Sequence, residues 1–135
     1  MPAYKEVVPS PAPEASRETI ASTYSSMRQE LVEKLDSSVA HLRQYADYFQ
    51  SKVESTKGKD KEKWTSLEIQ TRQMITQLLQ LKKNELPPEK PRDYDAAATQ
   101  LLNVAITLNR TLSAGYVTAW KDADFFPKFE TISDM

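Results

Sequence analysis

The sequence predicts an all-α protein: an antiparallel helical bundle of three long helices, with an extended proline-rich N-terminal arm and an aromatic C-terminal tail. Apolar residues recur at helical spacing through three segments that contain almost no proline or glycine. Strand signals, by contrast, are nearly absent, because apolar and polar residues do not alternate between hairpin turns. We therefore divide the chain into an arm (1–13), a bundle (14–120) and a tail (121–135).

The first predicted helix covers residues 14–57, a window without proline or glycine. Its apolar residues follow steps of four, three and four, which is typical of a nearly straight helix. A break near Ser37 would shift this phase and produce a four-helix bundle, but the phase does not shift. We therefore predict one continuous helix of about 60 Å. Its core-facing stripe consists of Ile20, Tyr24, Met27, Leu31, Leu35, Ser38, Leu42, Ala46, Phe49 and Val53.

Gly58 is expected to close the first helix in a left-handed conformation, and Asp60 is expected to cap a second helix over about 61–84. The broad apolar face of that second helix suits packing against two neighbours. A stiff, non-helical connector should follow, since proline lacks the N–H group that a helix needs. The connector prolines are Pro87, Pro88 and Pro91.

Asp93 is a good cap for a third helix that reaches about Trp120. At 1.5 Å per residue, the second and third helices are shorter than the first by about 20 Å, so the first should overhang them. Either this overhang folds back at a kink, or another chain covers it. The second possibility would make the protein a component of an assembly.

Composition and charge exclude several classes of function. The chain has 18 basic and 19 acidic residues and a net charge of −1, so we expect no nucleic-acid binding. It contains no cysteine, which excludes disulfides and thiolate chemistry. The sequence has no apolar stretch long enough to span a bilayer, so we expect a soluble protein without membrane insertion. It would be cytoplasmic if Met1 is the native start, or lumenal in an organelle if this is a processed form.

No catalytic, metal-binding or cofactor-binding site is predicted. His41 is the only histidine, and it lies beside the core stripe, where a structural role is the simpler interpretation. The pairs Asp93/Asp95 and Asp122/Asp124 lack the glycine and glutamate of a calcium loop. With only two glycines, the chain cannot build a phosphate-cradling loop. We therefore expect a non-enzymatic protein without a cofactor.

A run of lysines lies between the first two predicted helices. Acidic residues are interleaved with them, as is usual in a solvated loop, but a phosphate-binding patch is a second interpretation. Trp64 is the only aromatic residue close by in the sequence. The run comprises Lys57, Lys59, Lys61 and Lys63.

The residues predicted to bind a partner lie mainly at the two chain ends. Prolines stiffen the arm, phenylalanines make the tail too apolar for a solvated end, and one tyrosine lies off the first helix's stripe. We expect these residues to dock the chain onto a protein partner in a larger assembly, with no small molecule. The alternative is a small-molecule or lipid-binding bundle that uses the apolar faces of the second and third helices. The predicted partner-binding residues are Pro9, Pro11, Pro13, Tyr48, Phe125, Phe126 and Phe129.

From Trp64 onward the order of features resembles the PsbQ family, the lumenal extrinsic four-helix-bundle subunits of photosystem II. Trp64 opens a helix that contains Arg72, the turn Asn84-Glu85-Leu86-Pro87-Pro88 follows, and a helix then runs from Asp95-Ala96-Ala97 through Leu101 and Leu108 to a final segment ending near Phe129. The long first helix has no counterpart in that family. The resemblance implies a non-enzymatic subunit of the thylakoid lumen that stabilises the oxygen-evolving machinery.

Overall fold

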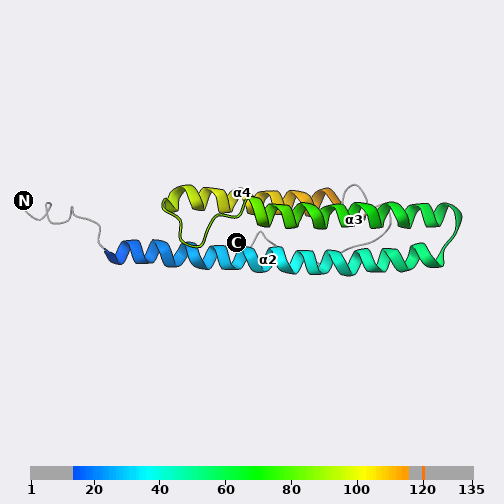
Figure 1. Cartoon of the computed structure of the whole chain (residues 1–135), viewed down its shortest axis with the longest axis horizontal. Helices are drawn as coiled ribbons and strands as arrows, with labels where there is room; N and C mark the ends of the chain where they lie inside the picture. Colours follow the sequence, from blue (N-terminus) through cyan, green and yellow to red (C-terminus); the bar gives the residue numbers. More distant parts are fainter. Residues whose placement is uncertain (1–13, 116–119, 121–135) are drawn as a thin grey trace, which may run out of the picture.

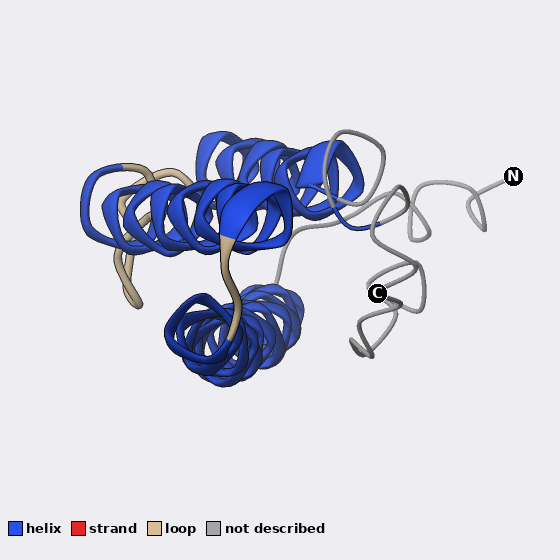
Figure 2. Cartoon of the chain, turned by 90° about the vertical axis from the view of Figure 1, so that its right-hand side faces the viewer, coloured by secondary structure: helices blue, strands red, loops and turns tan. Residues whose placement is uncertain are grey.

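The computed structural model describes residues 14–115 and Trp120. It contains three helices, α2 (Glu14–Ser55), α3 (Gly58–Asn84) and α4 (Tyr94–Gly115), each antiparallel to the one before (Figure 1). Seen from the end, α2 lies on one side and the other two helices lie together above it (Figure 2). The predicted all-α bundle is therefore confirmed. The predicted arm and the predicted tail both lie outside the described residues.

Helix α2 is continuous through its middle. It runs for 42 residues without a break at Ser37, so the prediction of one long helix is confirmed and the four-helix alternative is wrong. Ser38 is buried, as expected of the polar residue that fills a gap in the apolar stripe. Toward the N-terminal end the stripe prediction fails, since Ile20 is 52% and Met27 is 42% exposed. That end of α2 has fewer neighbours than its centre.

From the sequence we expected the overhang of α2 either to fold back at a kink or to be covered by another chain. The structure shows a third arrangement. The connector, residues 85–93, dips toward the side of α2, and the start of α4 lies beyond the end of α3 (Figure 1). The Tyr24 hydroxyl donates to the Pro88 carbonyl at 2.6 Å, and the Tyr24 ring meets the Tyr94 ring edge-on at 5.3 Å. At Tyr24, α2 therefore contacts the connector and α4 of its own chain, without a kink.

The turn between α2 and α3 differs in detail from the prediction. Gly58 is left-handed as expected, with φ of +64°, but it begins α3, whereas α2 already ends at Ser55. Lys57, in an extended conformation, is the N-cap residue and makes no side-chain capping bond. Asp60 is therefore not the cap. It lies within the first turn, where its negative charge still favours the positive end of the helix dipole.

Helix α4 begins as predicted. Asp93 Oδ1 accepts hydrogen bonds from the backbone N–H groups of Asp95 and Ala96, at 3.0 and 3.1 Å. These bonds satisfy two donors that have no partner within the helix, so Asp93 is the cap. The predicted end near Trp120 cannot be compared directly, since 116–119 lie outside the described residues.

The core lies between the three helices, and Trp120 closes it. The Trp120 indole is buried and its Nε1 donates to Thr71 Oγ1 on α3 at 3.2 Å, which satisfies both polar groups. Gly115 permits a close approach of α4 to α3, since a Cβ atom there would lie 2.5 Å from Met74 Sδ. Helix α3 thus packs against both neighbours, as its broad apolar face predicted.

Candidate functional site

Of the residues predicted to bind a partner, the described part of the chain includes only Tyr48. The other six, in the arm and the tail, lie outside it: Pro9, Pro11, Pro13, Phe125, Phe126 and Phe129. Tyr48 is 44% exposed, as its position off the apolar stripe predicted. The candidate site is therefore built from Tyr48 and its neighbours.

Tyr48 belongs to a group of aromatic and lysine side chains at the end of the bundle where α2 turns into α3. We call Tyr48, Lys52, Lys63 and Trp64 the turn cluster. The Tyr48 and Trp64 rings meet edge to face, with centroids 6.0 Å apart and an interplanar angle of 89°. Lys52 Nζ lies 5.5 Å from the Tyr48 ring and 6.0 Å from the Trp64 ring, and Lys63 Nζ lies 5.2 Å from the Trp64 ring. Each ammonium group is within cation–π distance of a ring.

Local helix geometry brings these residues together. Lys52 lies one turn after Tyr48 on α2, so the two side chains share a face. Phe49, fully buried, packs against the half-buried Trp64 ring at 5.8 Å and ties the cluster to the core. Sequence reasoning missed Lys52 and the pairing of Tyr48 with Trp64. The spacing of four residues between Tyr48 and Lys52 could have placed Lys52 beside Tyr48. The pairing with Trp64 had no such signal, because it depends on the register between the two helices, which is not a local property.

The lysines around the turn are not neutralised by the fold. Lys52, Lys57, Lys59, Lys61 and Lys63 take part in none of the ion pairs between the described residues. Glu54, Asp60 and Glu62 are interleaved with them and also form no ion pair in that part of the structure. This end of the bundle therefore presents positive charge that no carboxylate of the described residues holds.

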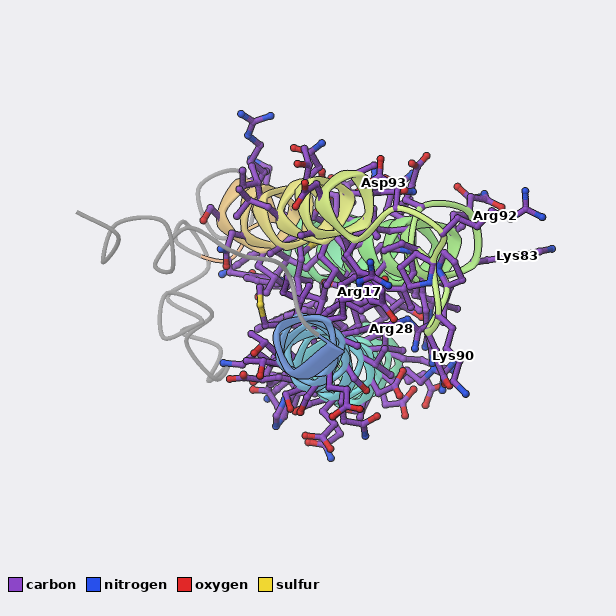
Figure 3. All side chains as sticks on the ribbon, turned by 90° about the vertical axis from the view of Figure 1, so that its left-hand side faces the viewer. Arg17, Arg28, Lys83, Lys90, Arg92 and Asp93 are labelled. Atoms are coloured by element: carbon purple, nitrogen blue, oxygen red, sulfur yellow. The ribbon has the colours of Figure 1, made fainter. Side chains whose placement is uncertain are left out.

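Two cations at the opposite end are used inside the molecule. Arg28 donates from Nε to the Pro87 carbonyl at 2.7 Å and lies 3.6 Å from a Glu89 carboxylate oxygen. Lys82 on α3 bonds Asp36 on α2 at 2.7 Å. Figure 3 shows this end of the bundle, with Lys83 and Arg92 extending away from the helices. These two, with Arg17 and Lys90, remain outside the ion pairs of the described residues.

Arg72, one of the residues that carry the PsbQ resemblance, links α3 to α2. It bonds Glu68 at 2.8 Å on its own helix, and Gln50 at 2.9 Å and Asp47 at 3.3 Å on α2. The hydrogen bond with Glu68 is the main cause that raises the pKa of Arg72, so the guanidinium stays charged. In this chain Arg72 therefore bridges the two helices.

His41 lies among aromatic rings at the edge of the core. It stacks on Tyr45 at 6.3 Å, and Tyr45 meets the Trp120 ring edge-on at 6.2 Å. This arrangement agrees with the structural role expected for the histidine. Among residues 14–115 and Trp120, no group of three histidine, aspartate or glutamate side chains is placed to hold a metal ion.

Further apolar side chains lie outside the core on the other two helices. Ile69 on α3 is 52% exposed, and Leu102 and Ile106 on α4 are 59% and 39% exposed. Ile69 and Ile106 are off-stripe positions in the sequence, whereas the exposure of Leu102 was not predicted. Val117, a further off-stripe residue, lies outside the described residues.

Comparisons of the chain with protein-family models, with curated proteins and with solved structures found no match. The resemblance to the PsbQ family therefore stays a prediction. No helix within the described residues is both long enough and apolar enough to cross a membrane.

Proposed function

We propose that this chain is a non-enzymatic accessory subunit that docks onto a larger protein complex. The observation that carries the proposal is the exposure of large apolar side chains on all three helices, at Tyr48, Ile69 and Leu102. These side chains add little to the core, and covering them with a partner would remove apolar surface from water.

The pair on α4 is the most informative of these positions. Single exposed apolar residues are common on protein surfaces, but Leu102 and Ile106 are one helical turn apart, so both lie on the same face of α4. They lie away from the buried face that contains Leu101 and Leu108. A partner could therefore cover them without disturbing the bundle.

A small-molecule or lipid-binding bundle is less well supported. That alternative needs the wide apolar faces of α3 and α4 to be open to a ligand. Leu78 on α3 and Leu108 on α4 are instead buried in the shared core, against side chains of α2. The bundle itself occupies the surfaces on which the alternative depends.

A finer proposal follows from the resemblance to the PsbQ family: an extrinsic subunit of photosystem II in the thylakoid lumen. It is supported by the order of the Trp64–Arg72 helix, the proline turn and the alanine-rich helix, which here are α3, the connector and α4. Rebinding to salt-washed photosystem II membranes would test it. Absence from those membranes, with retention in another complex, would remove the photosystem assignment and leave the docking function intact.

Size-exclusion chromatography of a native extract tests the docking function itself. The chain alone has a mass of 15.4 kDa, so elution in a much larger species is expected if it is a subunit. A double variant, Leu102→Ser with Ile106→Ser, should release the chain from that species. Ser113→Ala, at another exposed position of α4, is the control. Elution as a monomer with a bound small molecule would favour the alternative instead.

The predicted contribution of the chain ends is tested by truncation. Removal of residues 1–13 should weaken association with the complex and leave the melting temperature nearly unchanged, because a proline-rich chain end is expected to add little stability to a bundle. Removal of residues 124–135 should do the same if Phe125, Phe126 and Phe129 face the partner. If both truncated chains bind fully, docking uses the helices alone.

A further inference from the structure

We infer that the turn cluster binds an acidic segment of a partner protein. The inference rests on the proposed docking function and names the chemistry of one partner surface. It follows from three observations. The ammonium groups of the cluster lie close to aromatic rings, the lysines of this turn form no ion pair with another described residue, and acidic residues are interleaved with these lysines in the sequence.

The rings hold the two lysines of the cluster on a rigid support. Lys52 Nζ lies 5.5 Å from the centroid of the Tyr48 ring and 6.0 Å from that of the Trp64 ring, and Lys63 Nζ lies over Trp64. Attraction to the ring faces restricts these otherwise flexible side chains, so less conformational freedom is lost when a carboxylate binds. Because Trp64 packs on the buried Phe49, the position of the ammonium groups is coupled to the core.

The charge of the turn end is available to a partner. Within residues 52–63 there are five lysines and three acidic residues, and none of these lysines joins an ion pair with another described residue. A partner carboxylate would therefore add a charge-assisted hydrogen bond without breaking an internal one. Among the ion pairs between described residues, those of α2 and α3 include Arg28, Arg72 and Lys82.

The pattern of charge favours a protein segment over a continuous polyanion. Glu54, Asp60 and Glu62 lie among the lysines, so an evenly charged nucleic-acid backbone or anionic bilayer would also meet these carboxylates. The chain's net charge of −1 offers no long-range attraction to either. A peptide can space its acids to match the lysines. Its apolar side chains can then contact the exposed part of Tyr48.

The test measures binding of a labelled synthetic peptide, built of repeated Glu-Glu-Leu triplets, to the full chain by fluorescence anisotropy. The double variant Lys52→Ala with Lys63→Ala should weaken binding about tenfold, as expected for two central charges of an interface. The control is Lys83→Ala with Lys90→Ala, which removes two exposed, unpaired lysines from the opposite end (Figure 3). It should change the affinity less than about twofold.

A second variant tests the aromatic part of the cluster without a change of charge. Tyr48→Ala removes both one of the two rings close to Lys52 and the apolar surface offered to the peptide, and it should weaken peptide binding about threefold. Circular dichroism melting of each variant shows whether the bundle is still folded. If Tyr48→Ala binds the peptide as well as the natural chain, the rings do not organise the lysines and the inference fails.

Other outcomes also overturn the inference. Equal weakening by the two lysine pairs would show that net charge alone acts, and tighter binding to single-stranded DNA or to phosphatidylserine vesicles would identify a different class of partner. Failure to bind the peptide rejects this surface even when the chain still elutes within a larger complex. Conversely, peptide binding that requires Lys52 and Lys63, in a chain that elutes only as a monomer from extract, rejects the docking function alone.

Discussion

The two ends of the bundle carry similar side chains, cations beside aromatic rings, but use them differently. At the connector end, Tyr24 and Arg28 donate hydrogen bonds to the carbonyls of Pro88 and Pro87. At the turn end, Lys52 and Lys63 lie over rings and donate to no described residue.

The difference arises from what the backbone offers at each end. A proline-rich connector cannot form a helix, so its carbonyl groups lack helical partners and need donors from elsewhere. The turn between α2 and α3 is only two residues long, and it leaves few carbonyl groups for nearby lysines to cap. The same residue types therefore stabilise the fold at one end and remain available for binding at the other.

The largest effect is expected from breaking α2, the element that reaches both ends. Ser37→Pro should lower the free energy of unfolding by about 3 kcal/mol or more, through a lost hydrogen bond and a ring clash in the middle of the helix. Urea denaturation followed by circular dichroism measures it, with Ser37→Ala as control. An unchanged denaturation midpoint would contradict the continuous helix and, with it, any rigid connection between the two ends.

The next effect is expected at the connector end. Arg28→Met keeps much of the side-chain volume but leaves the Pro87 carbonyl without its donor, and Pro87 is buried. We expect a loss of about 1–3 kcal/mol, the range for an unsatisfied buried polar group. Arg17→Met, an exposed arginine on the same helix, is the matched control. Equal losses in both variants would mean that the Arg28–Pro87 bond does not stabilise the connector.

Tyr24→Phe should cost about 1 kcal/mol, because it removes one hydrogen bond but keeps the ring packed on Tyr94. Burial raises the pKa of the Tyr24 hydroxyl, while Arg28 lowers it and Tyr94 raises it. The folded state thus keeps a proton that the unfolded chain loses above about pH 10. The stability that Tyr24 adds is present below that pH and lost as the pH rises through the folded-state pKa.

Thermal melting of the two chains at about pH 8 and about pH 11 tests this pH dependence. At the lower pH the natural chain should have a higher melting temperature than Tyr24→Phe. At the higher pH the difference between the two melting temperatures should be smaller. Other effects of alkaline pH act on both chains alike, so they cancel when the two melting temperatures are subtracted. A gap that does not change with pH would show that Tyr24 does not titrate differently in the folded state.

The smallest effect is expected at the turn end. Lys63→Ala should change the free energy of unfolding by about 0.5–1 kcal/mol at most, which is the value of one exposed cation–π contact. Lys59→Ala, which has no such contact, serves as control and should have almost no effect. Chemical denaturation of both variants measures the difference. If Lys63→Ala lowered the free energy of unfolding as much as Arg28→Met does, the cations of the turn end would stabilise the fold as strongly as those of the connector end, contrary to the comparison made above.

Several features of the fold could be predicted because they depend on near neighbours in the sequence. The unshifted stripe through Ser38 predicted the continuity of α2, and Asp93 predicted the start of α4. Both depend on residues within a turn or two of one another. The cap of α3 was misassigned for a local reason too: a left-handed Gly58 can begin a helix as well as end one.

The candidate site was predicted only in part. Tyr48 could be placed off the stripe from the periodicity of α2, but its pairing with Trp64 depends on how α2 and α3 are aligned. That alignment brings together residues far apart in the sequence, as in the contacts of Arg72 with Asp47 and Gln50, which lie 25 and 22 residues away. No periodicity within a single helix contains this information.

Sequence alone determined which segments are helical, where the connector interrupts them and most, but not all, of the residues on the buried faces. Only the tertiary structure decided how the overhang of α2 is covered. Tyr24 and Arg28 reach carbonyls that are 64 and 59 residues further along the chain. The physical reason is the range of the interactions: helix periodicity and capping act within a few residues, whereas free connector carbonyls are satisfied by whichever donors the packing brings near.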